Sequence, residues 1–297
     1  MRTFVFFLFA AVLFAACSTA ENAESDPSKL KHYDLKGTIL SVDKAGRKIS
    51  VDHEEIPGYM SKMTMDFPVK DQVILNDLKP GSHITAVLVV DNPNGKFWLD
   101  NIVTTSAPGP GDKPLPVKEE AAAEGKPMID FSLVDQDNQK ISLKDFTGKA
   151  WAVTFIYSEC PLPDFCIAMS KHFSDAANKI VENEELKEKT RLLSVSFDPK
   201  RDTPEKLKSY GLGYLGKDSK ATDFKIWKLA AGEDKEIRKI ADFFGLRYEV
   251  DKKDNTQFNH SLRTAVITAD GKVAKVFSGN DWTVDELLRE LSSNTAK

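Results

Sequence analysis

The sequence is poor in cysteine, in net positive charge and in repeated segments, and each shortage excludes a class of protein. Only three cysteines occur in 297 residues, too few for the disulfide scaffold of small secreted domains. The net charge is −4, whereas nucleic-acid-binding proteins are usually basic. No low-complexity tract or fixed-period repeat is visible. What remains is an ordinary globular composition, 41% hydrophobic and 29% charged, in a chain long enough for about two domains.

An apolar run at the N-terminus predicts a targeting segment. It extends from Phe4 to Ala16 behind Arg2, which is too short for a comfortable membrane span and right for a signal-peptide core. It ends in small residues before Cys17 and so resembles a bacterial lipobox, although Phe14 stands where leucine is usual. We therefore expect a lipoprotein signal peptide at 1–16 and a lipidated Cys17, hence an exported lipoprotein anchored to a membrane and facing the periplasm. The alternative is an ordinary secretory signal with a chance cysteine.

The rest of the chain divides by composition into four parts. Residues 17–31 are polar and predict a tether, and residues 106–125 are rich in proline and glycine and predict a linker. Between them, residues 32–105 hold short alternating runs separated by turn signals, as in a small five-stranded barrel. Residues 126–297 alternate strand and helix signals, which predicts a thioredoxin-type α/β domain. Thr203 is the expected N-cap of a helix that begins at Pro204.

Cys160 and Cys166 are left as an isolated pair if Cys17 is lipidated. They lie between a buried strand, AVTFIY, and a helix, where the helix N-terminus stabilises thiolate. The spacing alone allows a structural disulfide, a redox dithiol or a soft-metal site. A metal site needs a further ligand, and only His172 and His260 follow the linker. Because His172 sits beside the core-facing Phe173, we expect it to be a solvated surface residue.

The α/β part resembles the Sco/SenC family of copper proteins. The resemblance rests on TFIYSECP, on the strand that leads into FDPKRDTPEKLKSY, and on NHS before an ADGKV hairpin, all in the family's order. It implies copper binding by Cys160, Cys166 and His260, with delivery to the binuclear copper centre of cytochrome c oxidase or thiol reduction there. It also places Asp198 close to the site. The chain departs from the family in its C-x5-C spacing, since C-x3-C is usual.

The β-rich part carries a second signal, a histidine followed by clustered methionines. Met63 and Met65 are two residues apart, so on a strand they share a face, and His53 ends the preceding strand. Thioethers and an imidazole suit Cu(I), although barrel core is the plain alternative for methionine. The segment resembles the periplasmic CusF-like copper-binding domain, which implies His53, Met63 and Met65 as ligands. Met60 stands where that family has a capping tryptophan and is a candidate fourth ligand.

Together these features predict an exported copper chaperone with two sites, carrying Cu(I), with Cu(II) left open. The copper acceptor implied is cytochrome c oxidase subunit II or a similar exported protein, and no nucleic-acid partner is expected. Two alternatives stay open: a thiol–disulfide reductase acting on a cuproprotein, which would make Cys160 and Cys166 catalytic, and a copper-buffering or resistance protein. A transfer of Cu(I) from the methionine site to the dithiol is a further hypothesis.

Overall fold

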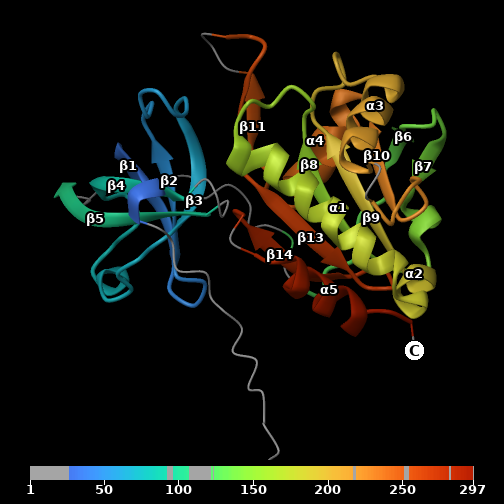
Figure 1. Ribbon diagram of the computed structural model, residues 1–297. Helices are drawn as coiled ribbons and strands as arrows, with labels where there is room; N and C mark the ends of the chain where they lie inside the picture. Colours follow the sequence, from blue (N-terminus) through green and yellow to red (C-terminus); the bar gives the residue numbers. More distant parts are fainter. Residues whose placement is uncertain are drawn as a thin grey trace, which may run out of the picture.

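A computed structural model describes residues 27–91, 96–106, 122, 124–216, 219–250, 254–280 and 282–296 (Figure 1). The expected signal peptide, the lipidated Cys17 and most of the tether and the linker lie outside these residues. Within the described part, no helix combines the length and the hydropathy needed to cross a membrane.

The N-terminal part is an all-β sheet of five antiparallel strands in the order β3-β2-β1-β4-β5. Alternation of buried and partly exposed side chains along β2 and β3 gives the sheet one inner face. The sheet curls toward closure, because the chain after β3 hydrogen-bonds to β5 through Lys70 N and Leu99 O at 3.0 Å. The elements are η1 (Pro27–Lys29), β1 (Lys31–Asp43), β2 (Lys48–His53), β3 (Met63–Pro68), η2 (Ile74–Asn76), β4 (His83–Asp91) and β5 (Lys96–Ser106).

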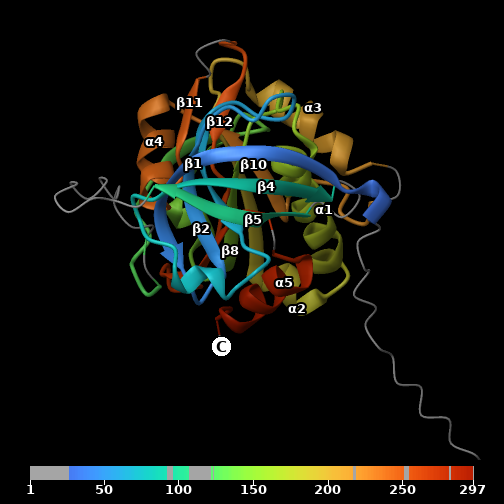
Figure 2. The same cartoon turned by 90° about the vertical axis from the view of Figure 1, so that its left-hand side faces the viewer.

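The C-terminal part is a seven-stranded sheet in the order β14-β13-β8-β9-β10-β6-β7. Strands β8, β9 and β10 run parallel at its centre, and every residue of β8 is buried, as expected where helices cover both faces. Figures 1 and 2 place α4 on the opposite face of this sheet from α1. Strands β11 and β12 form a separate hairpin.

The elements of this part are β6 (Ser132–Asp135), β7 (Lys140–Ser142), η4 (Leu143–Phe146), β8 (Ala150–Ile156), η5 (Pro163–Ile167), α1 (Ala168–Val181), α2 (Glu184–Lys189), β9 (Thr190–Ser196), α3 (Pro204–Tyr214), β10 (Trp227–Ala231), α4 (Asp234–Phe243), β11 (Tyr248–Val250), β12 (Phe258–His260), β13 (Arg263–Ile267), β14 (Val273–Ser278) and α5 (Val284–Ser293). The predicted fold class, a thioredoxin-type α/β unit behind an all-β unit, is confirmed.

Local expectations hold in part. Thr203 caps α3 by accepting from Lys206 N at 3.3 Å, and Pro204 occupies the first helical position, as predicted. The segment KISLKDF, for which the sequence predicts a short strand, is strand only in β7 and then turns into the 3-10 helix η4, whose capping box joins Ser142 and Asp145. Strand β10 was not expected from the sequence. The backbone turns at Gly271, which has a positive φ of 81°, between β13 and β14, as the predicted hairpin requires.

Candidate metal centres

Three elements bring Cys160, Cys166 and His260 together. Cys160 follows β8, Cys166 lies in the π-helical turn η5 that leads into α1, and His260 ends β12. One ligand atom from each residue lies within 4.8 Å of the others, and all three side chains are buried. Both cysteines are free thiols. The geometry therefore unites the two cysteines and the distant histidine that the resemblance implied.

Hydrogen bonds orient the sulfur and nitrogen atoms of this cluster. Tyr157 N donates to Cys166 Sγ at 3.4 Å, and His260 Nε2 lies 3.9 Å from the same sulfur. The Nδ1 atom of His260 is 3.0 Å from Ser261 O. Because a carbonyl oxygen only accepts, Nδ1 carries a proton, and Nε2 is the ring atom that faces the sulfur. His260 is therefore oriented to bind a metal through Nε2.

Three aromatic rings pack around the His260 imidazole. The ring centroids of Tyr157, Phe165 and Phe197 lie 5.8, 5.3 and 5.0 Å from that of the imidazole. Phe165 and Phe197 are almost fully buried themselves. Such an apolar shell keeps water from the sulfur atoms and lowers the local dielectric.

The pKa values of the two thiols are shifted in opposite directions. The pKa of Cys160 is lowered, chiefly because the Cys166 thiol hydrogen-bonds to its sulfur, with a smaller contribution from His260. The pKa of Cys166 is raised, chiefly because this side chain is completely buried. The metal-free pair is therefore one thiolate and one thiol at neutral pH. Such a pair is able to bind a soft metal and to carry out thiol–disulfide exchange.

Asp202 fixes the chain segment that leads to Cys160. It is 2% exposed and accepts hydrogen bonds from Ser158 N at 3.0 Å, from Ser158 Oγ and from Ser196 Oγ at 2.6 Å. These bonds tie the end of β8 to the end of β9. Sequence reasoning did not assign this role, although Asp202 belongs to the RDTPE motif that helped to establish the resemblance.

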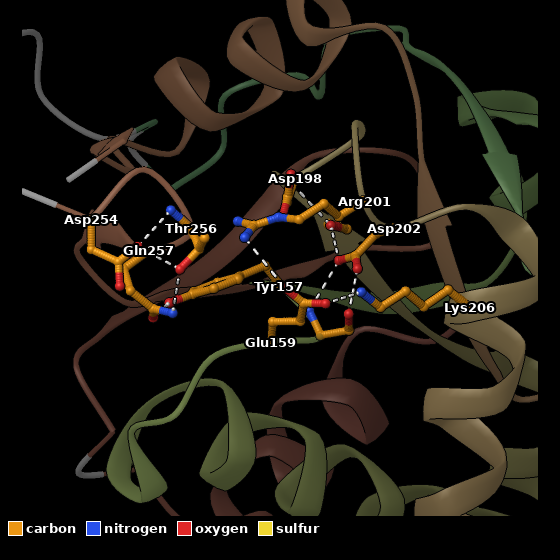
Figure 3. A network of polar contacts seen from close by, with 11 residues as sticks. Tyr157, Glu159, Asp198, Arg201, Asp202, Lys206, Asp254, Thr256 and Gln257 are labelled. Carbon is orange, nitrogen blue, oxygen red and sulfur yellow. Dashed lines mark hydrogen bonds and ion pairs between the residues drawn. The ribbon is translucent and has the colours of Figure 1, made fainter. Parts of the chain in front are cut away.

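Charged side chains extend this support at the surface (Figure 3). The Arg201 guanidinium donates to Asp198 and, at 3.3 Å, to Glu159, the residue before Cys160. Lys206 of α3 also binds Glu159. Asp198 thus contacts the cysteine segment through Arg201, and its expected role near the site stays a prediction.

Tyr157 connects the cysteine segment to the histidine segment. Its hydroxyl donates to Gln257 Oε1 at 2.9 Å, and Gln257 comes directly before β12 (Figure 3). Its ring also packs edge-on against Phe258, with centroids 5.1 Å apart. One side chain therefore links both halves of the candidate site.

His172, the other histidine after the linker, is outside this cluster. It was expected to be solvated, but it is only partly exposed and packs edge-on against Trp282 with centroids 4.7 Å apart. The expectation was wrong because α5 and the segment before it cover this side of α1.

The first sheet assembles the histidine and the methionines on its inner side. His53 of β2 lies directly opposite Met63 of β3, and Met63, Met65 and Phe67 share the buried face of that strand. Met60, in the segment between the strands, is 6% exposed. A Cβ on Gly37 would lie 2.8 Å from His53 Cα, so glycine is what allows β1 to approach β2 here.

One buried atom in this group has no polar contact. His53 is fully buried; its Nδ1 donates to Glu54 O at 2.6 Å, and its Nε2 has no hydrogen-bond partner among the described residues. Burial lowers the pKa of the imidazole, so Nε2 carries a lone pair and no proton. A buried acceptor without a partner is costly in a plain hydrophobic core. The atom and the thioethers beside it fit a soft metal ion.

Comparisons with known proteins match each part of the chain to a family. A family model described as SCO1/SenC matches residues 119–296, and one described as copper binding periplasmic protein CusF matches residues 32–97. A Bacillus subtilis SCO1 protein homolog is 27% identical over 168 residues, which are 55% of this chain and 80% of the homolog. A Rickettsia felis SCO2-like protein is 28% identical over 173 residues, which are 56% and 75% of the two chains. The crystal structure of a SCO1/SenC family lipoprotein from Bacillus anthracis superposes with a TM-score of 0.48 at 23% identity, covering 57% of this chain and 95% of that one.

Proposed function

Because the chain belongs to the SCO1/SenC family, we propose that it is an exported copper chaperone that binds copper through Cys160, Cys166 and His260. It delivers this copper to the binuclear copper centre of cytochrome c oxidase, on subunit II, or to a similar exported cuproprotein. The observation that carries the proposal is the meeting of two sulfur atoms and one imidazole nitrogen within 4.8 Å in a buried site.

The donor set favours copper over zinc. Structural zinc sites are almost always four-coordinate, and the cluster among the described residues has three members. Two sulfur ligands and an imidazole suit Cu(I), which accepts low coordination numbers and soft donors.

The first sheet supplies an auxiliary Cu(I) site. His53, Met63 and Met65 are its ligands, with Met60 as a fourth. The support is the unpartnered Nε2 of His53 beside buried thioethers, together with the match of this region to the CusF model. Thioethers resist oxidation better than thiols, so such a site collects copper in an oxidising compartment.

The N-terminus anchors the chaperone to a membrane. Cys17, at the end of the lipobox-like segment, is the lipidation site in this proposal. A Cys17→Ser variant is expected to remain uncleaved and unlipidated, which mass spectrometry of the membrane fraction detects. The same mature N-terminus in the variant and in the parent protein would exclude the anchor.

A reductase is the second candidate function, and a specific observation favours it. The lowered pKa of Cys160 beside the raised pKa of Cys166 gives an attacking thiolate and a neutral partner, as in dithiol oxidoreductases. His260 separates the two functions, because it is a metal ligand but transfers no electrons. His260→Ala is expected to weaken copper binding at least tenfold and to leave disulfide exchange largely intact.

An anaerobic Cu(I) titration against a colorimetric chelator tests the proposal. A chain that begins at Ser18 keeps every described residue. Two tight equivalents are expected, falling to one both in Cys160→Ser/Cys166→Ser and in Met63→Leu/Met65→Leu. One equivalent that survives the cysteine change would reduce the dithiol to a redox or structural pair.

Delivery is tested separately, because a buffering protein also binds two equivalents. The copper-loaded protein is mixed with the soluble, copper-free domain of oxidase subunit II, and the spectrum of the binuclear centre is followed. Formation of that spectrum supports a chaperone; retention of all copper by the loaded protein supports buffering.

A further inference from the structure

We propose that the two copper sites of this chain are docked against each other through their own ligand-bearing segments and that Cu(I) passes between them within one molecule. This inference rests on the proposed function. It adds a defined contact surface, a handover residue and a reason for the wide C-x5-C loop.

The first contact joins the methionine segment to the cysteine loop. The Tyr59 hydroxyl donates to Asp164 Oδ2 at 3.1 Å. Tyr59 directly precedes Met60, and Asp164 stands two residues before Cys166. One hydrogen bond therefore connects a segment of the first site to a segment of the second.

The second contact joins β3 to the chain after His260. Asp66, which follows Met65, pairs with Arg263 at 3.2 Å, and the two side chains are only 15% and 14% exposed. Strands β3 and β12 lie side by side, and His260 is the last residue of β12. Solvent and salt screen such a shielded ion pair less than one at an open surface.

One further contact between the units and one within the first unit support this interface. Lys48 Nζ donates to Ser278 O at 2.9 Å, and the ring of Tyr33 stacks on that of Tyr59 with centroids 4.5 Å apart. Figure 1 shows β3 as the strand of the first sheet that faces the second. Each contact lies on a ligand-bearing segment or braces one, as expected of a transfer surface.

The extra width of the cysteine loop is explained by this docking. Asp164 lies inside the loop, is 1% exposed, and its backbone oxygen accepts from Asn280 Nδ2 at 2.8 Å. The loop is thereby fixed on the second domain while its carboxylate reaches Tyr59 of the first. A shorter C-x3-C loop has fewer residues with which to make this contact.

The position of Met60 in the chain identifies it as the residue from which copper is handed over. Along β3, Met63 and Met65 point into the first sheet, whereas Asp66 points to the second domain. Met60 directly follows Tyr59, whose hydroxyl makes the contact, and its own side chain is buried. We therefore assign Met60 as the ligand that copper leaves last.

The transfer is a ligand exchange without a change of oxidation state. The bonds from Cu(I) to the His53 nitrogen and to the thioethers break, and bonds form to both sulfurs and to His260 Nε2. Cys166 releases its thiol proton to solvent. The direction follows from the greater affinity of thiolate than of thioether for Cu(I).

The test uses the chain from Ser18 with Cys160 and Cys166 first oxidised to a disulfide, which binds no Cu(I). One equivalent of Cu(I) is loaded, excess is removed, and a disulfide reductant that does not coordinate Cu(I) is added at concentrations where its own level no longer affects the rate. Appearance of the Cu(I)–thiolate absorption reports transfer. A rate independent of protein concentration is expected; a rate proportional to protein concentration would overturn the proposal.

Matched variants test the contact and the handover residue. Tyr59→Phe is expected to slow transfer about fivefold to tenfold, because one hydrogen bond to a carboxylate is lost. The control is Tyr214→Phe, which is expected to keep the parent rate. The hydroxyl that it removes hydrogen-bonds to Tyr210 at 3.3 Å inside the second domain. Met60→Leu slows transfer, whereas Met128→Leu, another buried methionine, does not. Equal rates for each variant and its control would overturn the assignment.

The two proposals fail in different ways. If the parent chain binds no Cu(I) that depends on Cys160 and Cys166, the proposed function fails. If it holds two equivalents but the dithiol fills only by collision between molecules, the docking proposal fails alone.

Discussion

At the residue scale, both candidate sites prepare a histidine in the same way. His53 and His260 each donate Nδ1–H to the carbonyl oxygen of the residue that follows, at 2.6 and 3.0 Å. Each Nε2 is thereby the ring atom that faces the buried interior of its site. Second-shell hydrogen bonds of this kind fix the tautomer and the ring orientation before a metal arrives. The two sites differ in their sulfur chemistry, thioether in one and thiol in the other.

The acidity of Cys160 gives a prediction at this scale. Since the hydrogen bond from Cys166 is the largest cause of the lowered pKa, Cys166→Ala is expected to raise the pKa of Cys160 more than His260→Ala does. The rate of alkylation by iodoacetamide, followed by mass spectrometry between pH 4 and pH 9, measures this shift. Cys166→Ser keeps an O–H donor and is expected to shift the profile less. Identical profiles in all four proteins would contradict the hydrogen-bond explanation.

At the element scale, the segment between β9 and α3 supports the cysteine segment. Its Asp202 receives three hydrogen bonds from the ends of β8 and β9, and its Thr203 begins α3. The same short stretch therefore connects the ends of two strands, caps a helix and positions Ser158, two residues before the first thiol. This explains why RDTPE is a more informative pattern than a bare pair of cysteines.

Asp202→Ala is expected to lower the free energy of unfolding by about 2–4 kcal/mol, because buried donors lose their acceptor. It is also expected to weaken Cu(I) binding at the dithiol, since Ser158 is no longer held. Urea unfolding and the chelator titration measure the two effects. The control is Thr203→Ala, which removes only the helix cap and costs about 1 kcal/mol. An Asp202 variant no less stable than this control would refute the role given to the carboxylate.

Elements with an unbroken apolar run or a cap were predictable, and those without either were not. Strand β8 follows from AVTFIY, and the start of α3 from Thr203 and Pro204. Strand β10, WKLAA, was not predicted because it is short and carries a charged residue, Lys228. The ammonium group of Lys228 bonds to the buried Asp135. Tertiary pairing between the neighbouring strands β9 and β6 decides its conformation.

At the scale of the whole molecule, the sequence indicated the two units and their separate metal residues but not how the units meet. The thiols and His260 were found through the family pattern, which carries information about distant contacts. The Tyr59–Asp164 and Asp66–Arg263 contacts follow no periodicity, since their partners lie in different units. Packing between tethered domains depends on surface complementarity, which a single sequence does not display.

Each unit contains a histidine whose pKa burial lowers, His53 in the first and His172 in the second. Such a histidine binds fewer protons in the folded than in the unfolded state, where its pKa is near 6.5. The contribution of these two histidines to the stability of the metal-free protein is therefore fully present above this pH. It decreases as the pH falls below 6.5 and stops decreasing once the pH is below the lowered folded pKa.

His172→Gln is expected to flatten this decrease between pH 7 and pH 5.5 for the unfolding of the second unit. Trp98 of the first unit is replaced by phenylalanine in every protein compared, so tryptophan fluorescence during urea unfolding follows the second unit, where Trp282 packs against His172. His32→Gln, at an exposed position of β1, is the matched control and is expected to leave the slope unchanged. The reductant is kept in excess so that the dithiol does not change state. Equal slopes for the parent protein and His172→Gln would show that burial against Trp282 does not restrict protonation of this histidine.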